Sequence, residues 1–122
     1  MITKLWGWLS LAYMGAIFLI SSLPGRELPN LAGKDHYLHL LEFGVLGVLL
    51  ALWAWGRFRD DHPAWLVALG VVAFVSFYGA TDELHQLFVP GRCCDLLDWV
   101  ADTVGGVVSV LIILPLLRRR EG

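Results

Sequence analysis

Four apolar stretches, each about as long as a membrane span, occupy most of this 122-residue chain. A helix needs roughly 20 apolar residues to cross about 30 Å of hydrocarbon, because each residue adds only about 1.5 Å along the axis. Proline and glycine interrupt the chain between these stretches, as they do in turns. The expected spans cover residues 5–23, 37–55, 64–88 and 96–117. The sequence therefore predicts an all-α fold, an integral membrane bundle of four transmembrane helices that forms one domain over residues 1–122.

The composition agrees with a membrane environment. Hydrophobic residues make up 57% of the chain and charged residues only 16%, which is too apolar for an ordinary soluble domain. A formal net charge of −2 disfavours nucleic-acid binding, which requires a clustered basic face. The two cysteines, Cys93 and Cys94, are neighbours and cannot link separate parts of the fold.

The distribution of charge predicts the orientation, since short cytoplasmic loops retain Lys and Arg. Six of the nine basic residues lie at the termini or in the middle loop, namely Lys4, Arg57, Arg59, Arg118, Arg119 and Arg120. Both termini are therefore expected in the cytoplasm. The acidic residues gather on the opposite side: Glu27, Asp35, Glu42, Asp82, Glu83, Asp95, Asp98 and Asp102. This asymmetry is larger than topology requires.

Polar residues recur at helical spacing on three of the predicted helices. The groups that share a face are Asp35, His39 and Glu42, then Asp82, His85 and Gln86, then Asp95, Asp98 and Asp102. Glu83 is turned about 100° away from Asp82. Each group descends roughly 10 Å from its helix end, and a buried ionisable residue costs roughly 2.5–3.5 kcal/mol on insertion scales. We expect these side chains to face one water-accessible cup that opens outward.

A simpler explanation accounts for part of this set. The helix dipole favours carboxylates near helix N-termini, which explains Asp35 and Asp95 without a ligand, and an ordinary structural role also suffices for Glu83. The Pro90-Gly91 pair favours a type II turn that directs Arg92 over the mouth of the cup. There Arg92 could bind a phosphate or carboxylate through two hydrogen bonds, or simply neutralise a nearby aspartate. Neither dipoles nor pairing requires polar groups on three helices at one depth.

Three segments contain a recognisable pattern: SSLPG at 21–25, DHYLHLLEFGVLG at 35–47 and ATDELHQLFVPGRCCDLLDWVADTVGG at 80–106. Together they resemble the VanZ-like family over nearly the whole chain. The family pattern is D-K-x-x-H in the second helix, D-E-x-x-Q and P-G-R at the third, and D-x-x-x-N-x-x-G in the fourth. The matching positions are Asp35, His39, Asp82, Glu83, Gln86, Pro90, Gly91, Arg92, Asp98 and Gly105. His36 stands where lysine is usual and Asp102 where asparagine is common, so this site is more acidic than the family norm.

The resemblance implies a multi-pass protein of the bacterial cytoplasmic (inner) membrane, with its polar site on the extracytoplasmic side. The founding member is associated with low-level resistance to the glycopeptide teicoplanin. The resemblance implies no particular reaction, so whether the protein is an enzyme stays open. Its expected partners are membrane lipids, together with a lipid-linked cell-wall precursor or a glycopeptide antibiotic.

Three functions compete on these residues. An enzyme would use His39, Asp82 and Asp98 as catalytic groups for acid–base chemistry. A divalent cation could assist, held by Asp82, His85, Asp98 and Asp102, although their spacing matches no established metal motif. A binder without turnover would hold the headgroup of an envelope lipid or the antibiotic through Asp35, Glu83, Gln86 and Arg92. An ion or proton conductor is disfavoured, because the cytoplasmic halves of the expected spans lack ionisable residues.

Overall fold

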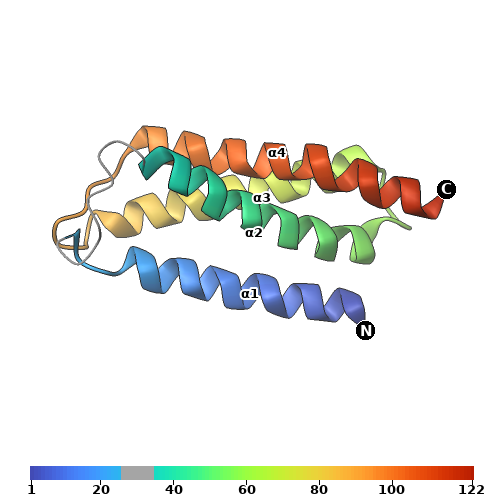
Figure 1. Ribbon diagram of the computed structural model, residues 1–122, viewed down its shortest axis with the longest axis horizontal. Coiled ribbons are helices and arrows are strands. Elements are labelled where there is room, and N and C mark those ends of the chain that lie inside the picture. Colours follow the sequence, from blue (N-terminus) through green and yellow to red (C-terminus); the bar gives the residue numbers. More distant parts are fainter. Residues whose placement is uncertain (26–34) are drawn as a thin grey trace.

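The computed structural model describes residues 1–25 and 35–122, without the side chain of Asp35. It consists of four helices, α1 (Ile2–Ser21), α2 (Asp35–Phe58), α3 (Ala64–Gln86) and α4 (Leu96–Glu121), which run along one long axis (Figure 1). Each helix is long and apolar enough to cross a membrane, and the part of the chain that the structure describes contains no strand. The predicted all-α membrane bundle is thus confirmed.

The helix ends differ from the predicted spans by a few residues. The largest extension is at α4, which continues to Glu121 with three arginines in its last turn. Positive side chains there interact favourably with the negative end of the helix dipole, so α4 continues beyond its apolar stretch. Helix α3, in contrast, is shorter than its predicted span, because it ends at Gln86, before the turn that contains Pro90.

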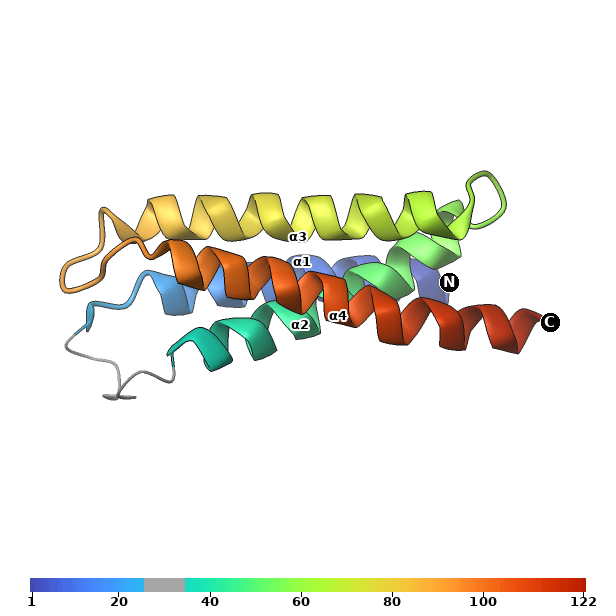
Figure 2. The same ribbon diagram turned by 90° about the horizontal axis from the view of Figure 1, so that it is seen from above.

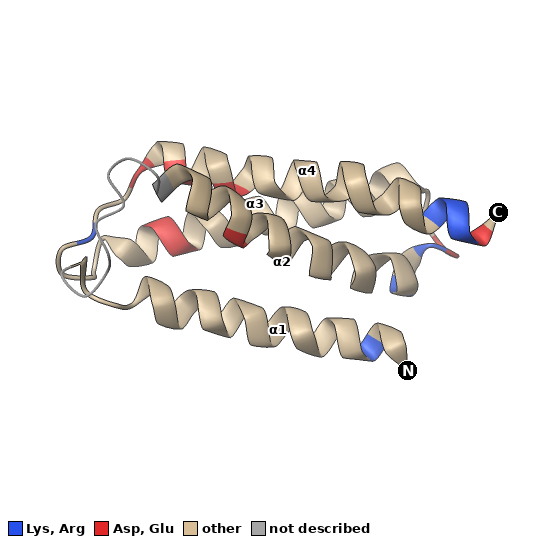
Figure 3. Ribbon diagram, viewed as in Figure 1, with Lys and Arg blue, Asp and Glu red and all other residues tan. Residues whose placement is uncertain are grey.

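The bundle has two chemically different ends. Both chain termini and the α2–α3 connection lie at one end, and the last residues of α1, the first residues of α2 and the α3–α4 connection lie at the other (Figures 1 and 2). Among the described residues, Lys and Arg gather at the end with the termini, whereas most Asp and Glu lie in the opposite half (Figure 3). Arg92, which hydrogen-bonds to Leu23 O just beyond the end of α1, also lies in that opposite half. We call these the termini end and the polar end.

Helices α2 and α4 form the most extensive contact in the bundle, while α1 and α3 barely touch. Glycine makes the α2–α4 approach possible. A Cβ atom at Gly105 would lie 2.6 Å from the carbonyl oxygen of Leu40 and 2.8 Å from the amide nitrogen of Gly44. The two backbones are therefore in direct contact, as small residues permit in membrane helices.

The surface has the opposite chemistry to that of a soluble protein, and the interior contains ionisable groups beside an apolar core. Large apolar side chains are exposed on all four helices, Leu19 for example at 68%, while the carboxylate residue Asp102 is 0% exposed. An apolar core, which includes Phe43, Leu46 and Val75, lies between the helices. Such a surface is stable in lipid, where the tails solvate it. The chain is a multi-pass membrane protein.

Candidate functional site

A buried histidine–aspartate pair lies where α2 meets α4. His39 Nδ1 is 2.8 Å from Asp102 Oδ1, and both side chains are almost completely buried. Gly79 of α3 provides the space on the far side, because a Cβ atom there would lie 2.8 Å from Asp102 Oδ2. Three helices therefore enclose this pair.

Glu83 joins the pair from α3. Its Oε1 atom is 3.8 Å from His39 Nδ1, and its Oε2 atom accepts a hydrogen bond of 3.0 Å from the backbone N–H of Asp95. Helical spacing predicted that Glu83 points about 100° away from the face that carries Asp82. However, α3 packs against both α2 and α4, so its interior face is wide enough to include Glu83 as well. We call His39, Glu83 and Asp102 the inner cluster.

Two oxygen atoms in the inner cluster have no hydrogen-bond partner among the described residues: Glu83 Oε1 and Asp102 Oδ2. Glu83 is only 3% exposed and Asp102 is 0% exposed. An unpartnered buried carboxylate oxygen is costly. Both atoms are therefore positioned to accept a proton, a water molecule or a cation.

An outer cluster of His36, Asp95 and Asp98 lies next to the inner one. His36 Nδ1 is 2.6 Å from Asp98 Oδ1, with the imidazole side chain 40% exposed. Asp98 Oδ2 is 3.6 Å from His39 Nε2, which joins the two clusters. The sequence analysis did not include His36 in the site, although its i, i+3 spacing from His39 and its place at a usual lysine position were available signals.

A third group of polar side chains faces α1. Gln86 Nε2 donates to Ser21 Oγ over 3.2 Å, and His85 Nε2 lies 2.9 Å from Ser22 Oγ. The serine hydroxyl of Ser21 is also a hydrogen-bonding neighbour of the buried Asp82 carboxylate. These two serines belong to the SSLPG segment, whose role in the site the sequence analysis missed.

The residues predicted to hold a metal are therefore divided. Asp98 and Asp102 face α2, whereas Asp82 and His85 face α1. Among the described residues, two sets of side chains are compact enough for one ion: the inner cluster and the outer cluster, each with its ligand atoms within 4.8 Å of one another. Neither set contains Asp82 or His85.

The turn between α3 and α4 has the predicted geometry. Gly91 has a φ of 74°, and the N–H of Arg92 donates to Val89 O over 3.1 Å, as in a type II turn. Arg92 Nη1 donates to Leu23 O over 3.2 Å, and the N–H of Gly25 donates to the neighbouring Pro90 O. The turn is thus fastened to the end of α1, and in the described chain Arg92 forms no ion pair with an aspartate.

Asp95 acts as the N-cap of α4, because its Oδ1 atom accepts a hydrogen bond of 2.9 Å from the N–H of Leu97. Asp35 begins α2, but its side chain lies outside the described residues. Cys93 and Cys94 are free and exposed. Desolvation, followed by the charges of Glu83 and Asp95, raises the pKa of the Cys94 thiol.

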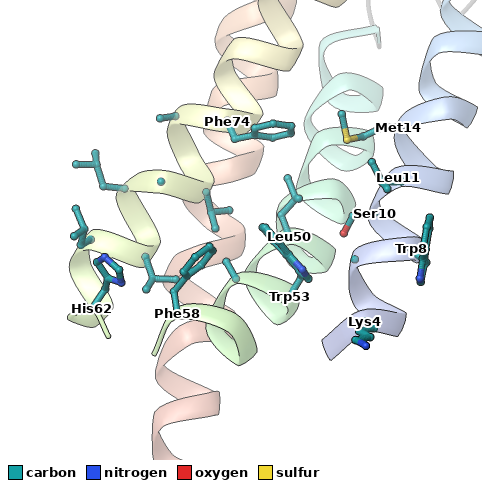
Figure 4. Close-up of a pocket in the computed structure, with 18 residues that line it drawn as sticks. Lys4, Trp8, Ser10, Leu11, Met14, Leu50, Trp53, Phe58, His62 and Phe74 are labelled. Carbon is teal, nitrogen blue, oxygen red and sulfur yellow. The ribbon is translucent and has the colours of Figure 1, made fainter. Parts of the chain in front are cut away.

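The polar side chains pack against one another, and a large groove lies in a different part of the bundle. A groove of about 1050 Å³ opens between α1, α2 and α3 towards the termini end. Figure 4 shows its apolar lining, which includes Trp53 and Phe74, and only Lys4 and His62 among its described residues are titratable. In a bilayer, lipid chains fill such an apolar surface. The groove is not part of the polar site.

A family model described as VanZ/LLP1 matches residues 8–118 of the chain. This range contains all three polar groups. No curated protein matches the chain, and no solved structure matches it.

Proposed function

We take as premise that the chain belongs to the VanZ/LLP1 family, and we propose that its polar end binds the headgroup of an amphiphile of the bacterial envelope. The observation on which this rests is the His36–Asp98 pair of the outer cluster, in which a partly exposed imidazole contacts a buried carboxylate that lies directly beside further buried ionisable groups. Ionisable groups inside a membrane protein are costly and tend to mark binding or transport sites.

The charges at the polar end favour a headgroup with both signs, because the carboxylates of the outer cluster and the guanidinium of Arg92 both lie there. Asp95 and Asp98 attract an ammonium group, whereas the guanidinium of Arg92 suits a phosphate or carboxylate. Arg92 uses one donor on Leu23 O and has further N–H groups for a ligand. A ligand with an amine and an anionic group matches this arrangement.

The orientation in this proposal follows from the positive-inside rule. Lys and Arg gather at the termini end (Figure 3), so the termini are placed in the cytoplasm and the polar end outside the cytoplasmic membrane. The ligand would then be an envelope lipid, a lipid-linked cell-wall precursor or a glycopeptide antibiotic. Binding changes how much of it is free at the outer surface, which is a route to teicoplanin resistance.

One observation favours a second candidate, an enzyme that acts on the same amphiphile. His39 is oriented by the buried carboxylate of Asp102 at 2.8 Å, as a general base is oriented in hydrolytic sites. His39→Gln would then abolish turnover of the bound amphiphile and leave its binding unchanged, whereas a binder would show no turnover to lose.

Lipid retention by the purified protein tests headgroup binding. We expect native mass spectrometry to show retained phosphatidylethanolamine, which has both an amine and a phosphate, in preference to phosphatidylglycerol. Asp98→Asn should weaken retention about tenfold, equivalent to roughly 1.4 kcal/mol. Asp60→Asn is the matched control, because the same change is made in an exposed carboxylate at the termini end.

Teicoplanin and a lipid-linked precursor are added in separate arms of the same experiment, to distinguish the three ligand sources. Expression of the wild type and of Asp60→Asn should raise the teicoplanin concentration that inhibits growth, whereas Asp98→Asn should not. Equal retention of every amphiphile by wild type and Asp98→Asn would overturn the proposed function.

A further inference from the structure

The geometry points to a divalent-cation site formed by His39, Glu83 and Asp102, the inner cluster, with Zn²⁺ or Mn²⁺ as its ion. This site goes beyond headgroup binding and does not depend on it. It also differs from the ligand set that the sequence predicts, since it includes Glu83 and His39 and excludes His85.

The distances in the cluster suit one shared ion. His39 Nδ1 lies 2.8 Å from Asp102 Oδ1 and 3.8 Å from Glu83 Oε1, and all three ligand atoms lie within 4.8 Å of one another. An ion about 2.0–2.2 Å from each ligand in a tetrahedral arrangement separates the ligands by roughly 3.4 Å. The observed distances lie on either side of that value, so small side-chain movements complete the site.

The two unpartnered oxygen atoms are an independent indication of a ligand. Glu83 Oε1 and Asp102 Oδ2 are buried and accept no hydrogen bond from the described residues. Buried polar atoms without partners are rare in native proteins and require an explanation such as a bound ion. A cation bound by both carboxylates would give Glu83 Oε1, 3.8 Å from His39 Nδ1, a direct partner, and it would balance the charge of the Asp102 carboxylate to which Oδ2 belongs.

Charge balance supports a doubly charged ion. The cluster contains two carboxylates and one imidazole, and a neutral imidazole is the form that binds metal. Asp98 Oδ2 also faces His39 Nε2 at 3.6 Å, but Asp98 is already paired with His36. Two carboxylates and one divalent ion are therefore neutral together, which reduces the cost of burial.

The ligand types select the kind of ion. Ca²⁺ and Mg²⁺ prefer oxygen ligands alone, whereas Zn²⁺ and Mn²⁺ accept one imidazole nitrogen with two carboxylates. Three protein ligands leave a coordination position for water or for another ligand. The outer cluster lacks this support, because among the described residues no oxygen atom of Asp95 or Asp98 is both buried and without a hydrogen-bond partner.

Ion binding by the full-length protein, purified with its affinity tag removed and treated with a chelator, tests the site. Addition of Zn²⁺ or Mn²⁺ should give one bound ion per chain in native mass spectrometry and should raise the Tm as the ion concentration increases. Mg²⁺ and Ca²⁺ at equal concentration should have a much smaller effect.

Glu83→Gln and Asp102→Asn should each lower the ion's affinity by more than the roughly 10- to 100-fold that loss of an outer-shell partner costs. Asp102→Asn retains an oxygen that accepts from His39, so the apo fold remains measurable by circular dichroism. Asp60→Asn is the matched control, because the same change is made in an exposed carboxylate at the termini end. It should leave the affinity unchanged.

Nitrogen coupling in the electron paramagnetic resonance spectrum of bound Mn²⁺ should be present in the wild type and lost in His39→Gln. Absence of a bound ion and of any Tm change with both Zn²⁺ and Mn²⁺ would overturn the inference. Affinity that is lost in Asp95→Asn but kept in Glu83→Gln would overturn it too, since the ion would then occupy the outer cluster. Headgroup retention is tested with Asp98→Asn, so the proposed function and the cation site can each fail without the other.

Discussion

The two ends of the bundle show contrasting ways of packing helices in lipid. At the polar end, α2, α3 and α4 enclose the inner cluster, and Gly79 lies directly against Asp102. Towards the termini end, α1 and α3 border an apolar groove of about 1050 Å³, and nothing lies within 4 Å of a Cβ atom at Gly70. Lipid chains can fill an apolar groove at little cost, but they cannot solvate a carboxylate. Helices α1 and α2 also approach closely at the termini end, where a Cβ atom at Gly56 would lie 2.5 Å from Thr3 Oγ1. The contrast therefore concerns α3, which packs tightly at Gly79 and borders the groove at Gly70.

Hydrogen bonds attach α1 to the bundle at intermediate depth, close to its buried core residue Ile17. Tyr13 Oη donates to the carbonyl oxygen of Glu42 over 2.8 Å, and Tyr78 Oη donates to that of Met14 over 2.6 Å. Both bonds have a helix carbonyl as acceptor, and they connect α1 to α2 and to α3. These two hydrogen bonds thus hold α1 in place next to the groove.

The largest expected effect is an all-or-none difference in chemical access between the ends. An impermeant maleimide should label Cys93 and Cys94 in intact cells, because both are exposed at the polar end and that end is proposed to face outward. A cysteine introduced by Asp61→Cys, at the termini end, should be labelled only after the membrane is opened. The protein with Asp61→Cys must also carry Cys93→Ser and Cys94→Ser, so that only the introduced cysteine can react.

The pH dependence of labelling provides a control on the site of reaction. Since the pKa of Cys94 is raised by desolvation and then by Glu83 and Asp95, the reactive thiolate is scarce at neutral pH. Labelling of Cys94 should therefore accelerate from pH 7 to pH 9 more than that of a free cysteine does. Labelling of Asp61→Cys in intact cells, in the background that lacks Cys93 and Cys94, would reverse the assigned orientation.

A matched pair of substitutions on one helix measures the difference in packing between the ends. Gly79→Ala should lower the free energy of unfolding by about 1–3 kcal/mol, because the added methyl group overlaps Asp102. Gly70→Ala should raise it by up to about 1 kcal/mol, since alanine favours the helix and the groove has room. Reversible unfolding in mixed micelles, followed by circular dichroism, gives both values.

Equal destabilisation by the two alanine substitutions would show that the groove is as tightly packed as the polar end, and the contrast would be wrong. Gly15→Ala serves as a further control, because its Cβ atom also meets nothing within 4 Å.

The smallest effect is expected from the ion pair at the termini end. Glu121 Oε1 pairs with Arg59 and accepts a hydrogen bond of 3.1 Å from Trp55 Nε1. Both charged side chains are about two-fifths exposed, so Glu121→Gln should cost at most about 1 kcal/mol of unfolding free energy. The same unfolding assay at low and high salt should show the loss shrinking as salt increases. If Glu121→Gln lost as much unfolding free energy as Gly79→Ala, the termini end would depend on its ion pair as strongly as the polar end depends on close packing.

Features that depend on residues close in sequence were predictable. The four helices, the cap at Asp95 and the type II turn at Gly91 follow from apolar length, capping chemistry and a Pro-Gly pair. The family resemblance was also confirmed, because its motifs are local patterns in a fixed order. The open cup was a less accurate expectation, since the polar side chains bury one another and the large groove is apolar.

Only the tertiary structure decided which polar side chains meet. It pairs His39 with Asp102 and Glu83, and it turns His85 towards Ser22. Helical periodicity fixes the angle between two residues of one helix, but not the rotation of that helix against its neighbours. Here that rotation depends on contacts between distant residues, such as Gly79 with Asp102 and Gly105 with Leu40. The sequence by itself therefore determined the helices and the end at which polar groups collect, whereas close backbone approach at glycine determined the clusters, because packing between helices is not a local property.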